Sequence, residues 1–405
     1  MKALTFKRYG KSPEIGFSEV PRPALKADEM LVQVHAAGVN PVDNMIPAGI
    51  FKAVLKFQLP ATLGSDLAGV VVEVGSRVTR FKVGDAVFAN IFDQGTGSIA
   101  EFAVVPEGTA ALKPANLDFV QAASIPMVGL TSWQALKERI GLRAGQKMFI
   151  PAGSGGIGTF AIQLAKLLGA TVIATGRSQA KLDAVAAEGA DHVIAVGDLD
   201  SEAGQRDLRD RVRAVTGGRG VDVVHDGVGG PISVASLRCV RFGARYLIVG
   251  WAATPGVARG KGGRGAPNAN QLPTNLLMMK ALTVQGCPTV LATLHDPSLR
   301  PPRLDRIMRW VAEGKIVPHV SHVFPLAEFK EAMRAKWRGA ARNCQRWSTG
   351  ACENAAHSGL AAGGAIGSPV APLAGPGGAG RRFAGLAGVA GRPLRDQPGS
   401  GKARA

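Results

Sequence analysis

The chain has 405 residues, with 48 Lys and Arg against 30 Asp and Glu, which gives a formal net charge of +18. That length suggests roughly two or three domains and leaves ample chain for a large core, so neither a metal ion nor a disulfide is needed for stability. A composition of 46% hydrophobic and 19% charged residues excludes a wholly disordered chain, a collagen and a coiled coil.

The cysteines and the N-terminus indicate a reducing compartment. The four cysteines are scattered and form no CxxC pair, so neither a zinc ribbon nor a disulfide scaffold is predicted. The first residues, MKALTFKRYG, lack the apolar core of a signal peptide. No apolar run approaches the ~20 residues that a membrane helix needs. We therefore expect a cytoplasmic protein that makes no contact with a membrane.

Two patterns follow one another along the chain. Residues 1–115 consist of short alternating or β-rich segments between Gly and Pro, which predicts a compact, barrel-like β domain. From residue 118 onward, predicted strands and helices alternate, beginning with KMFIP, IGTFAIQLAKLLG and TVIAT. Such alternation indicates βαβ units and a parallel sheet. The predicted fold class is therefore α/β, with a β-rich domain followed by a doubly wound parallel-sheet domain.

The strongest motif is a glycine-rich turn between a predicted strand and a predicted helix. Gly153-Ser154-Gly155-Gly156-Ile157-Gly158 fits G-x-G-x-x-G in the context that a dinucleotide site requires. Gly153 allows the tight turn, Gly155 lets the backbone approach a pyrophosphate, and Gly158 permits close helix–strand packing. The helix N-terminus supplies free N–H groups to the phosphates. The predicted cofactor site includes the whole hexapeptide and the preceding Ala152.

The end of the next predicted strand, TVIAT, indicates which dinucleotide binds. An NAD site usually has Asp or Glu there, whereas this chain has Thr175-Gly176-Arg177-Ser178 and then Lys181. Cations and hydroxyls suit a 2′-phosphate, so NADPH or NADP+ is the predicted cofactor, held by Thr175, Arg177, Ser178 and Lys181. The alternative is that Arg177 and Lys181 only begin a solvated helix.

Six motifs together resemble one known family. They are GVNPVD at 38–43, LGSDLAGVVVEVG at 63–75, VGDAVFA at 83–89, GLTSWQAL at 129–136, AGSGGIG at 152–158 and VDVVHDGVGG at 221–230. In this order, across about residues 1–338, they are similar to the medium-chain dehydrogenase/reductase superfamily, in its zinc-free quinone oxidoreductase (zeta-crystallin-like) branch. The resemblance implies a GroES-like catalytic domain over 1–121, a Rossmann NADP-binding domain over 122–290 and a return to the first domain over 291–339.

The resemblance also allows zinc to be considered position by position. Zinc-dependent relatives have a Cys, a His and a Cys or His at positions that match Asn40, Ser65 and Met127. Zinc prefers Cys, His and carboxylate ligands, so these residues predict a site without metal. The four closely spaced cysteines of a structural zinc lobe are also absent from the sequence. Asp66, which matches a Glu in those relatives, is then expected to be a cleft or structural carboxylate.

Further site residues are implied by the same resemblance. Asn40 is expected beside the nicotinamide or the substrate carbonyl, and Thr131 in contact with the nicotinamide region. Asp43 is either a catalytic candidate or a brace for the turn after Pro41. The segments Gly227-Val228-Gly229 and Val249-Gly250-Trp251 are expected to line the ribose and carboxamide of the cofactor, with packing as the alternative for Trp251. The expected substrate pocket is formed by Met45, Ser65, Asp66 and Met127.

The absence of a predicted metal indicates the kind of reaction. A zinc-free site has no strong Lewis acid for an alcohol, whereas a quinone or an activated C=C delocalises the arriving charge. The resemblance therefore implies a homodimeric, NADPH-dependent reductase of quinones or α,β-unsaturated carbonyls, with a small molecule as electron acceptor. Tyr9 and Tyr246 lie outside the cleft motifs, so the proton is expected from solvent.

Two other functions stay open. One is an enoyl-thioester reductase whose basic loop at 259–264 holds an acidic carrier. The other is a non-catalytic protein that binds NADPH or nucleic acid, as the net charge of +18 would allow. The basic residues are not interleaved with aromatic side chains, which a base-stacking surface would require.

Residues 340–405 have a different character. They contain eight Lys or Arg, two Asp or Glu, and mostly Gly, Ala and Pro, without a hydrophobic period. We expect a disordered basic tail, produced by a change of reading frame or a fusion near residue 339. Family members end with a strand of the type Gly-Lys-x-Val-Leu, which this sequence lacks. We therefore expect an unpaired sheet edge in the β domain.

Overall fold

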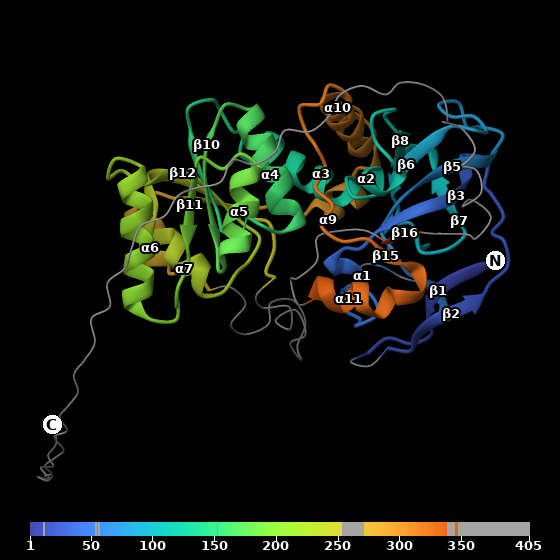
Figure 1. Cartoon of the computed structure of the whole chain (residues 1–405), viewed down its shortest axis with the longest axis horizontal. Helices are drawn as coiled ribbons and strands as arrows, with labels where there is room; N and C mark the ends of the chain where they lie inside the picture. The colour runs from blue at the N-terminus through green and yellow to red at the C-terminus, as the bar shows by residue number, and fades with distance from the viewer. Residues whose placement is uncertain are drawn as a thin grey trace, which may run out of the picture. The chain divides into compact units, whose positions relative to one another are not determined.

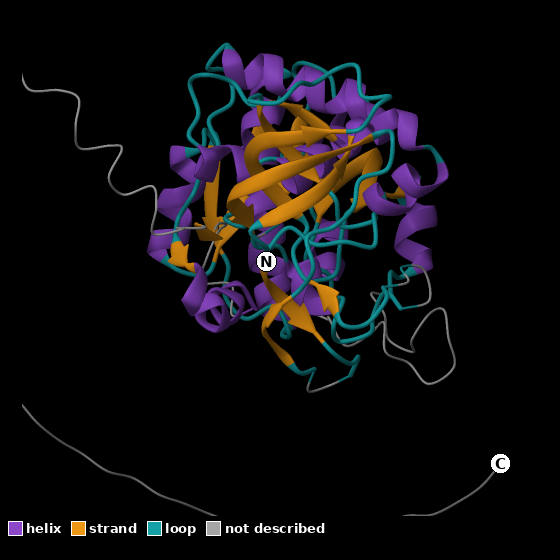
Figure 2. Cartoon of the chain, turned by 90° about the vertical axis from the view of Figure 1, so that its right-hand side faces the viewer, coloured by secondary structure: helices purple, strands orange, loops and turns teal. Residues whose placement is uncertain are grey.

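The computed structural model describes residues 1–10, 13–52, 55, 57–151, 153–252, 271–337 and 345–346. Its first part is built mainly from antiparallel strands, in one sheet of order β2-β1-β4 and a second of order β15-β16-β3-β5-β6-β8, where β7 also pairs with β3 and β15 pairs with β16 in parallel (Figures 1 and 2). The strands are β1 (Lys2–Phe6), β2 (Ile15–Glu19), β3 (Glu29–Gly38), β4 (Ala61–Thr62), β5 (Asp66–Val74), β6 (Ala86–Asn90), β7 (Phe102–Pro106), β8 (Ala110–Leu112), β15 (Phe324–Pro325) and β16 (Gln345–Arg346).

Alternation along β3 produces the core of this domain. Met30, Val32 and Val34 lie at every second position, so their side chains point to the same face of the strand. There they pack with buried residues of the neighbouring strands, including Val71 of β5 and Val87 of β6. Burial of each such side chain contributes about 1.5–3 kcal/mol.

The third sheet is parallel, forms the second domain and has the strand order β11-β10-β9-β12-β13-β14. The predicted α/β class, with a β-rich domain and a doubly wound parallel sheet, is confirmed. The strand order reverses between β9 and β12, which is where such sheets bind ligands at their carboxyl edge. The elements are β9 (Lys147–Ile150), α4 (Gly156–Leu167), β10 (Thr171–Gly176), α5 (Gln179–Ala187), β11 (His192–Ala195), α6 (Glu202–Val215), β12 (Val221–Asp226), α7 (Pro231–Arg238), β13 (Val240–Ile248), α8 (Thr274–Met279) and β14 (Thr283–Gly286).

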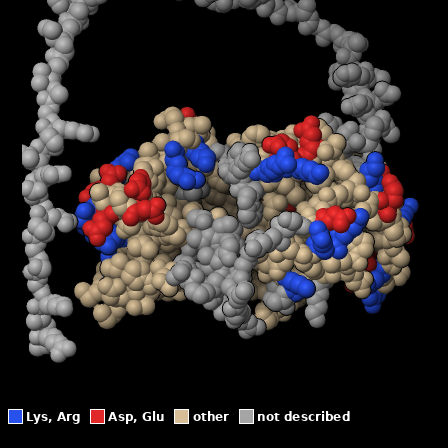
Figure 3. Space-filling model, turned by 90° about the horizontal axis from the view of Figure 1, so that it is seen from below, with Lys and Arg blue, Asp and Glu red and all other residues tan. Residues whose placement is uncertain are grey.

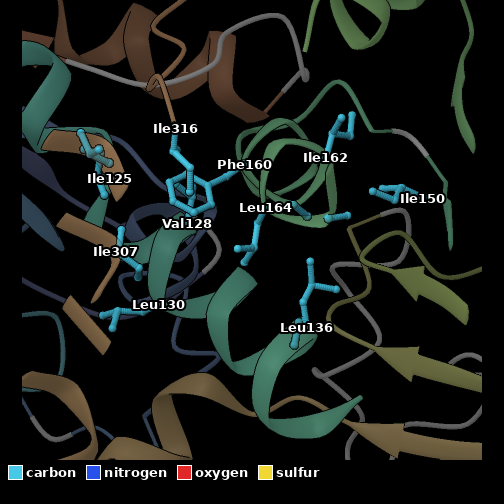
Figure 4. Packing of buried hydrophobic residues seen from close by; sticks show 14 of the residues in the cluster. Ile125, Val128, Leu130, Leu136, Ile150, Phe160, Ile162, Leu164, Ile307 and Ile316 are labelled. Atoms are coloured by element: carbon cyan, nitrogen blue, oxygen red, sulfur yellow. The ribbon is translucent and has the colours of Figure 1, made fainter. Parts of the chain in front are cut away.

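Each face of the parallel sheet has its own core. On one face, Ile150 of β9 and Ile162 of α4 belong to one buried cluster, and Phe160 of α4 points to the other side of its helix, toward Val128 of α3 (Pro126–Trp133) (Figure 4). On the other face, Phe149 and its neighbours pack against the apolar side of α6 and α7. The helices that lead into this domain are α1 (Pro41–Met45), a 3-10 turn (Glu107–Thr109), α2 (Phe119–Ala123), α3 (Pro126–Trp133) and a π-helical turn (Gln134–Arg139).

After β14 the chain returns to the first domain. Phe329 and Met333 of α11 (Phe329–Trp337) pack in one buried cluster with Leu4 and Phe6 of β1. Asn44 Nδ2 donates a hydrogen bond to the Met333 carbonyl at 3.3 Å. The returning elements are α9 (Thr289–His295), a 3-10 turn (Pro297–Leu299), α10 (Arg300–Ala312), a second 3-10 turn (Leu326–Glu328) and α11 (Phe329–Trp337). None of the helices in the described ranges is long and apolar enough to cross a membrane.

One expectation about the C-terminal segment is wrong. Residues 345–346 form β16, which pairs with β3 opposite Ala36 and Ala37 and with β15 on its other side. This edge of the β domain is therefore paired at β16. The sequence did not predict the pairing, because backbone hydrogen bonds require only an extended chain and no particular side-chain pattern. The rest of the predicted tail at 340–405, and the predicted basic loop at 259–264, lie outside the described residues.

Candidate functional site

A sealed polar cluster lies where β5 and β6 meet α3. Asp66 begins β5, and its Oδ2 accepts hydrogen bonds from Asn40 Nδ2 at 2.8 Å and from the Met127 backbone N–H at 3.1 Å. Its Oδ1 accepts from Asn90 Nδ2 at 2.6 Å. We call Asn40, Asp43, Ser65, Asp66 and Asn90 the Asp66 cluster; these residues are only 0–3% exposed.

Bonds inside the cluster use both N–H groups of the Asn40 side chain. Asn40 Nδ2 donates to Ser65 Oγ and to the Asp66 carboxylate, each at 2.8 Å. Because an ionised carboxylate can only accept, this contact fixes the orientation of the amide. Asp43 Oδ2 accepts from the Asn40 backbone N–H at 2.6 Å and from Ser65 Oγ at 3.3 Å. Asp43 thus braces the start of α1, and Asn40 keeps no side-chain N–H for a substrate carbonyl.

The three positions that match zinc ligands do meet in space. Asn40 and Ser65 touch each other, and Met127 reaches the same carboxylate as Asn40 through its backbone. The donor set does not fit zinc, since an amide, a hydroxyl and a thioether replace the Cys and His ligands that zinc prefers. Both Asp66 oxygens accept hydrogen bonds instead. Within the described ranges, no group of three or more His, Cys, Asp or Glu side chains could hold a metal ion.

The turn after β9 leaves an open backbone approach. Gly155 is the N-cap of α4, and a Cβ built on it would meet no atom within 4 Å. A Cβ on Gly158 would lie only 2.3 Å from the Gly153 carbonyl oxygen, so the helix packs backbone to backbone on the turn. Ser154, Gly156 and Ile157 lie in the same turn, whereas Ala152 is outside the described residues. The free N–H groups at the start of α4 fit the phosphates of a dinucleotide.

Two cations follow β10, with Arg177 directly after the strand and Lys181 in the first turn of α5. Thr175 is buried in the strand, whereas Arg177 and Ser178 are exposed at the start of α5. Asp183, the nearest carboxylate along the chain, accepts a hydrogen bond from Gln179 Nε2 at 2.7 Å. Neither Arg177 nor Lys181 forms an ion pair with a residue in the described part of the chain. Their charges therefore fit the 2′-phosphate of an NADP-type cofactor.

The predicted segments after β12 and β13 are joined by Asp226, a residue that the sequence analysis did not select. Asp226 is 2% exposed at the carboxyl end of β12. Its Oδ1 accepts hydrogen bonds from the backbone of Val228 at 2.8 Å and Gly229 at 3.0 Å. Its carbonyl accepts from the backbone of Val249 at 2.7 Å and Gly250 at 3.2 Å. Gly227 accepts in turn from Ala252 at 3.2 Å, and the neighbouring Trp251 is 41% exposed.

Helix α3 connects the Asp66 cluster with the glycine-rich turn. Near its start, Met127 donates to Asp66, and near its end, Ser132 Oγ donates to the Ile157 carbonyl at 3.4 Å. Thr131 lies one residue earlier, with its carbonyl 4.0 Å from the sulfur of Cys287. The helix thus carries Thr131 between the two groups of predicted residues.

Two residues beside Thr131 were missed by the sequence analysis. Cys287 follows β14 and donates to Gln134 Oε1 at 3.2 Å. Burial raises the pKa of the Cys287 thiol to about 11, which keeps it protonated at neutral pH. Gln134 begins the π-helical turn, a feature that often marks functional sites.

The remaining predicted residue, Met45, lies in the β domain, and a hollow opens in the parallel-sheet domain. Met45 ends α1 and is half-buried. A hollow of about 290 Å³ opens beside the loops that follow β11 and β12. It is lined by Leu199, Asp200, Gln205, Gly230, Pro231, Val234 and Gln271.

Comparison with known proteins agrees with this architecture. Residues 26–115 match the alcohol dehydrogenase GroES-like domain, and residues 156–297 match the zinc-binding dehydrogenase family. A β-rich domain joined to a dinucleotide-binding sheet of this kind defines a two-domain dehydrogenase/reductase fold. The chain belongs to the medium-chain dehydrogenase/reductase superfamily, in its quinone oxidoreductase group, as the sequence motifs predicted.

Relatives of known sequence and structure support that assignment. The mouse mitochondrial NAD(P)H oxidoreductase RTN4IP1 is 32% identical over 371 residues, which cover 84% of this chain and 87% of that protein. The tomato (Solanum lycopersicum) 2-methylene-furan-3-one reductase is 36% identical over 263 residues, but these cover 63% of each chain, just under two thirds. The Arabidopsis thaliana NADPH-dependent alkenal/one oxidoreductase is also 36% identical, over 64% of its length and 63% of this chain.

Solved structures extend the likeness to the whole fold. A Novosphingobium aromaticivorans protein of the alcohol dehydrogenase superfamily has a TM-score of 0.73 and 30% identity, over 86% of this chain and 100% of that chain. The Escherichia coli quinone oxidoreductase complexed with NADPH has a TM-score of 0.72 and 25% identity, with the same coverage.

Proposed function

We propose that the protein transfers hydride from NADPH to a quinone or an α,β-unsaturated carbonyl without zinc. The Asp66 cluster carries this proposal, since it places a closed hydrogen-bond network at the positions that match zinc ligands. The names of the tomato and Arabidopsis relatives, and the NADPH complex of the bacterial structure, support the same chemistry.

Different segments of the parallel-sheet domain would bind different parts of the cofactor. The start of α4, with Gly155 open to solvent, would accept the diphosphate. Arg177 and Lys181 would pair with the 2′-phosphate. The segments after β12 and β13 would hold the nicotinamide end near Thr131. A bound NADPH would supply the hydride.

The class of substrate that accepts the hydride follows from the groups that this chain has to stabilise negative charge on it. The buried Asp66 cluster has no free side-chain N–H on Asn40, so it would shape the cleft rather than polarise a carbonyl. A quinone or an enone spreads the charge over its own conjugated system and needs positioning more than a Lewis acid. Tyr246 is an unsuitable acid because burial raises its pKa above the usual range and its hydroxyl is bonded to Asp226. The proton would come from solvent.

The choice of cofactor is tested at Arg177. Arg177→Ala should weaken NADPH binding about 10- to 100-fold, because a charge-assisted contact to phosphate is lost. NADH binding should stay unchanged, as that cofactor lacks the 2′-phosphate. Arg206→Ala is a matched control, since Arg206 is exposed on α6 and paired with Glu202 at 3.2 Å. Equal affinity of the unmodified protein for both cofactors would refute the NADPH assignment.

The metal and the acceptor need separate measurements. Purified protein should contain no stoichiometric zinc by elemental analysis, and a chelator should leave NADPH oxidation unchanged. A panel of quinones and enones should show turnover. One tightly held zinc per chain, or no acceptor reduced, would contradict the proposal.

We also propose that the protein is a cytoplasmic homodimer. Met278 and Phe242, both 71% exposed, lie near β14, which is the last strand of the parallel sheet. Met278→Asp should shift the mass measured by light scattering from dimer to monomer. Cys239 and Cys287, the free cysteines among the described residues, suit a reducing compartment. Cell fractionation would test the location.

The charge pattern of the described surface gives little support to nucleic-acid binding. On the face that Figure 3 shows, many Lys and Arg side chains lie next to Asp and Glu side chains, in several separate groups. On α6, Arg206, Arg209 and Arg211 each pair with a carboxylate. Such pairing leaves less positive potential for a phosphate backbone.

A further inference from the structure

We propose that Asp226 is a positioning residue that sets both loops at the nicotinamide end of the cofactor site. This inference rests on the proposed function, because it assumes that a dinucleotide lies across the carboxyl edge of the parallel sheet. Asp226 itself is buried, so it would act through the loops and would not touch the cofactor.

The Asp226 carboxylate is held by four donors. Oδ1 accepts from the backbone N–H groups of Val228 and Gly229. Oδ2 accepts from the hydroxyl of Tyr246 at 2.7 Å and from the hydroxyl of Ser233. Four donors around a buried carboxylate compensate the cost of removing its charge from water. The orientation of the carboxylate is therefore fixed, because each of its oxygens accepts two hydrogen bonds.

Its bonds lead to two different loops. The two donors on Oδ1 belong to the turn after β12, where Gly229 has a φ of +77° and Gly230 a φ of +72°. The backbone carbonyl of Asp226 accepts hydrogen bonds from the backbone N–H groups of Val249 and Gly250, just after β13. Tyr246, two residues before the end of β13, binds Asp226 from the neighbouring strand. One residue thus fixes the two segments relative to each other.

A brace for the fold alone would be expected between core elements. Here the Oδ1 partners lie at the open edge of the sheet, where Gly227 and Val228 are half-buried. The sheet itself is already joined at this point by the register of Asp226 with Ile248. The Oδ1 contacts therefore add little to strand pairing and determine the shape of the turn after β12, whereas the Oδ2 contacts tie the carboxylate to Tyr246 of β13 and Ser233 of α7.

The test separates loop shape from general stability by using two ligands. NADPH spans the whole site, whereas 2′,5′-ADP carries only the adenosine end that Arg177 and Lys181 would hold. Asp226→Ala should raise the Kd of NADPH about 30-fold and change the Kd of 2′,5′-ADP less than about twofold, because the turn after β12 loses its side-chain acceptor while the adenosine end of the site is unaffected. Asp226→Asn should raise the Kd of NADPH only about threefold, since the amide oxygen still accepts from Val228 and Gly229.

Asp222→Ala is the matched control. Asp222 lies on the same strand at its other end, accepts the Lys147 backbone N–H at 2.7 Å and pairs with Arg241 at 2.5 Å. Its loss should leave the Kd of both ligands unchanged. If Asp226→Ala does not fold, Tyr246→Phe gives the second readout, with an expected rise of about threefold in the Kd of NADPH alone.

The outcomes distinguish this inference from the proposed function. Equal weakening of NADPH and 2′,5′-ADP by the Asp226 variants, or no weakening of NADPH, would overturn the positioning role. Binding of NADPH by the unmodified protein without reduction of any quinone or enone would overturn the proposed reaction only, because the Kd measurements do not depend on turnover.

Discussion

Asp66 and Asp226 are two buried carboxylates at strand ends that differ in what surrounds them. Asp66 accepts from Asn40, Asn90 and the Met127 backbone, so most of its donors are side chains of the β domain. Asp226 accepts from loop backbone and from two hydroxyls of the parallel-sheet domain. The same chemistry closes a cluster in one domain and shapes an open loop in the other. A buried charge can therefore serve either purpose, and its donors show which.

The largest effect is expected from breaking the closed cluster. Asp66→Ala leaves the amides of Asn40 and Asn90 buried without an acceptor, and should lower the free energy of unfolding by about 3–5 kcal/mol. Urea unfolding measures the change. Asp28→Ala is the control, because Asp28 is exposed and pairs loosely with Arg77 at 3.8 Å. A loss below about 1 kcal/mol at Asp66, like that of an exposed pair, would contradict its structural role.

The buried His225, which precedes Asp226, should make the stability of the protein depend on pH. Burial lowers the pKa of His225 to about 4, and its Nε2 has no partner among the described residues. The pKa of His225 in the folded state lies below its unfolded value of 6.5, so the unfolded state takes up the proton first as the pH falls. The stability that depends on a neutral His225 is therefore fully present above pH 6.5 and is lost as the pH falls toward 4. The loss is on the order of 3 kcal/mol.

His225→Phe should remove this contribution, because the ring then has no site to protonate. Unfolding by urea at several pH values between 4 and 7 would show a flatter profile for the variant than for the unmodified protein. Identical slopes would mean that His225 does not titrate on unfolding in this range.

A smaller effect sharpens the same comparison. Asn90→Ala removes one donor from Asp66 Oδ1 and leaves the two donors on Oδ2, so the free energy of unfolding should fall by about 1–2 kcal/mol. NADPH affinity should not change, because the cluster belongs to the other domain. Calorimetry and a titration would test both statements, and a loss of affinity without a loss of stability would be the opposite result.

The smallest effect is expected at the helix that joins the two regions. Ser132→Ala removes a hydrogen bond of 3.4 Å to the Ile157 carbonyl and should cost less than about 1 kcal/mol of stability. The Kd of NADPH should rise at most about threefold, because α4 keeps its own packing on Gly153. A much larger loss of affinity would show that α3, rather than the turn, controls the position of α4.

The sequence predicted the architecture better than the roles of single residues. The alternation of strands and helices predicted the parallel sheet, and the spacing from Gly153 to Gly158 predicted the turn, because both patterns depend on local backbone geometry. The role of Asn40 could not be predicted in this way, since its two N–H groups are used by Ser65 and Asp66, which lie far along the chain.

Other contacts gave partial signals or none. Asp226 stands within a motif that was recognised, and a carboxylate at the carboxyl end of a strand beside the switch point could have been selected on that ground. Asn90 lies outside the recognised motifs. The pairing of β16 also has no sequence signal, because its hydrogen bonds use only backbone atoms.

That pairing implies unusual freedom of substitution. The protection of the β3 edge opposite Ala36 and Ala37 comes from N–H and C=O groups that almost every amino acid carries in the same place. Most replacements at positions 345 and 346 should therefore preserve it, whereas proline, which lacks the N–H, should not. At these two positions the backbone conformation is therefore constrained, whereas the identity of the side chain is not.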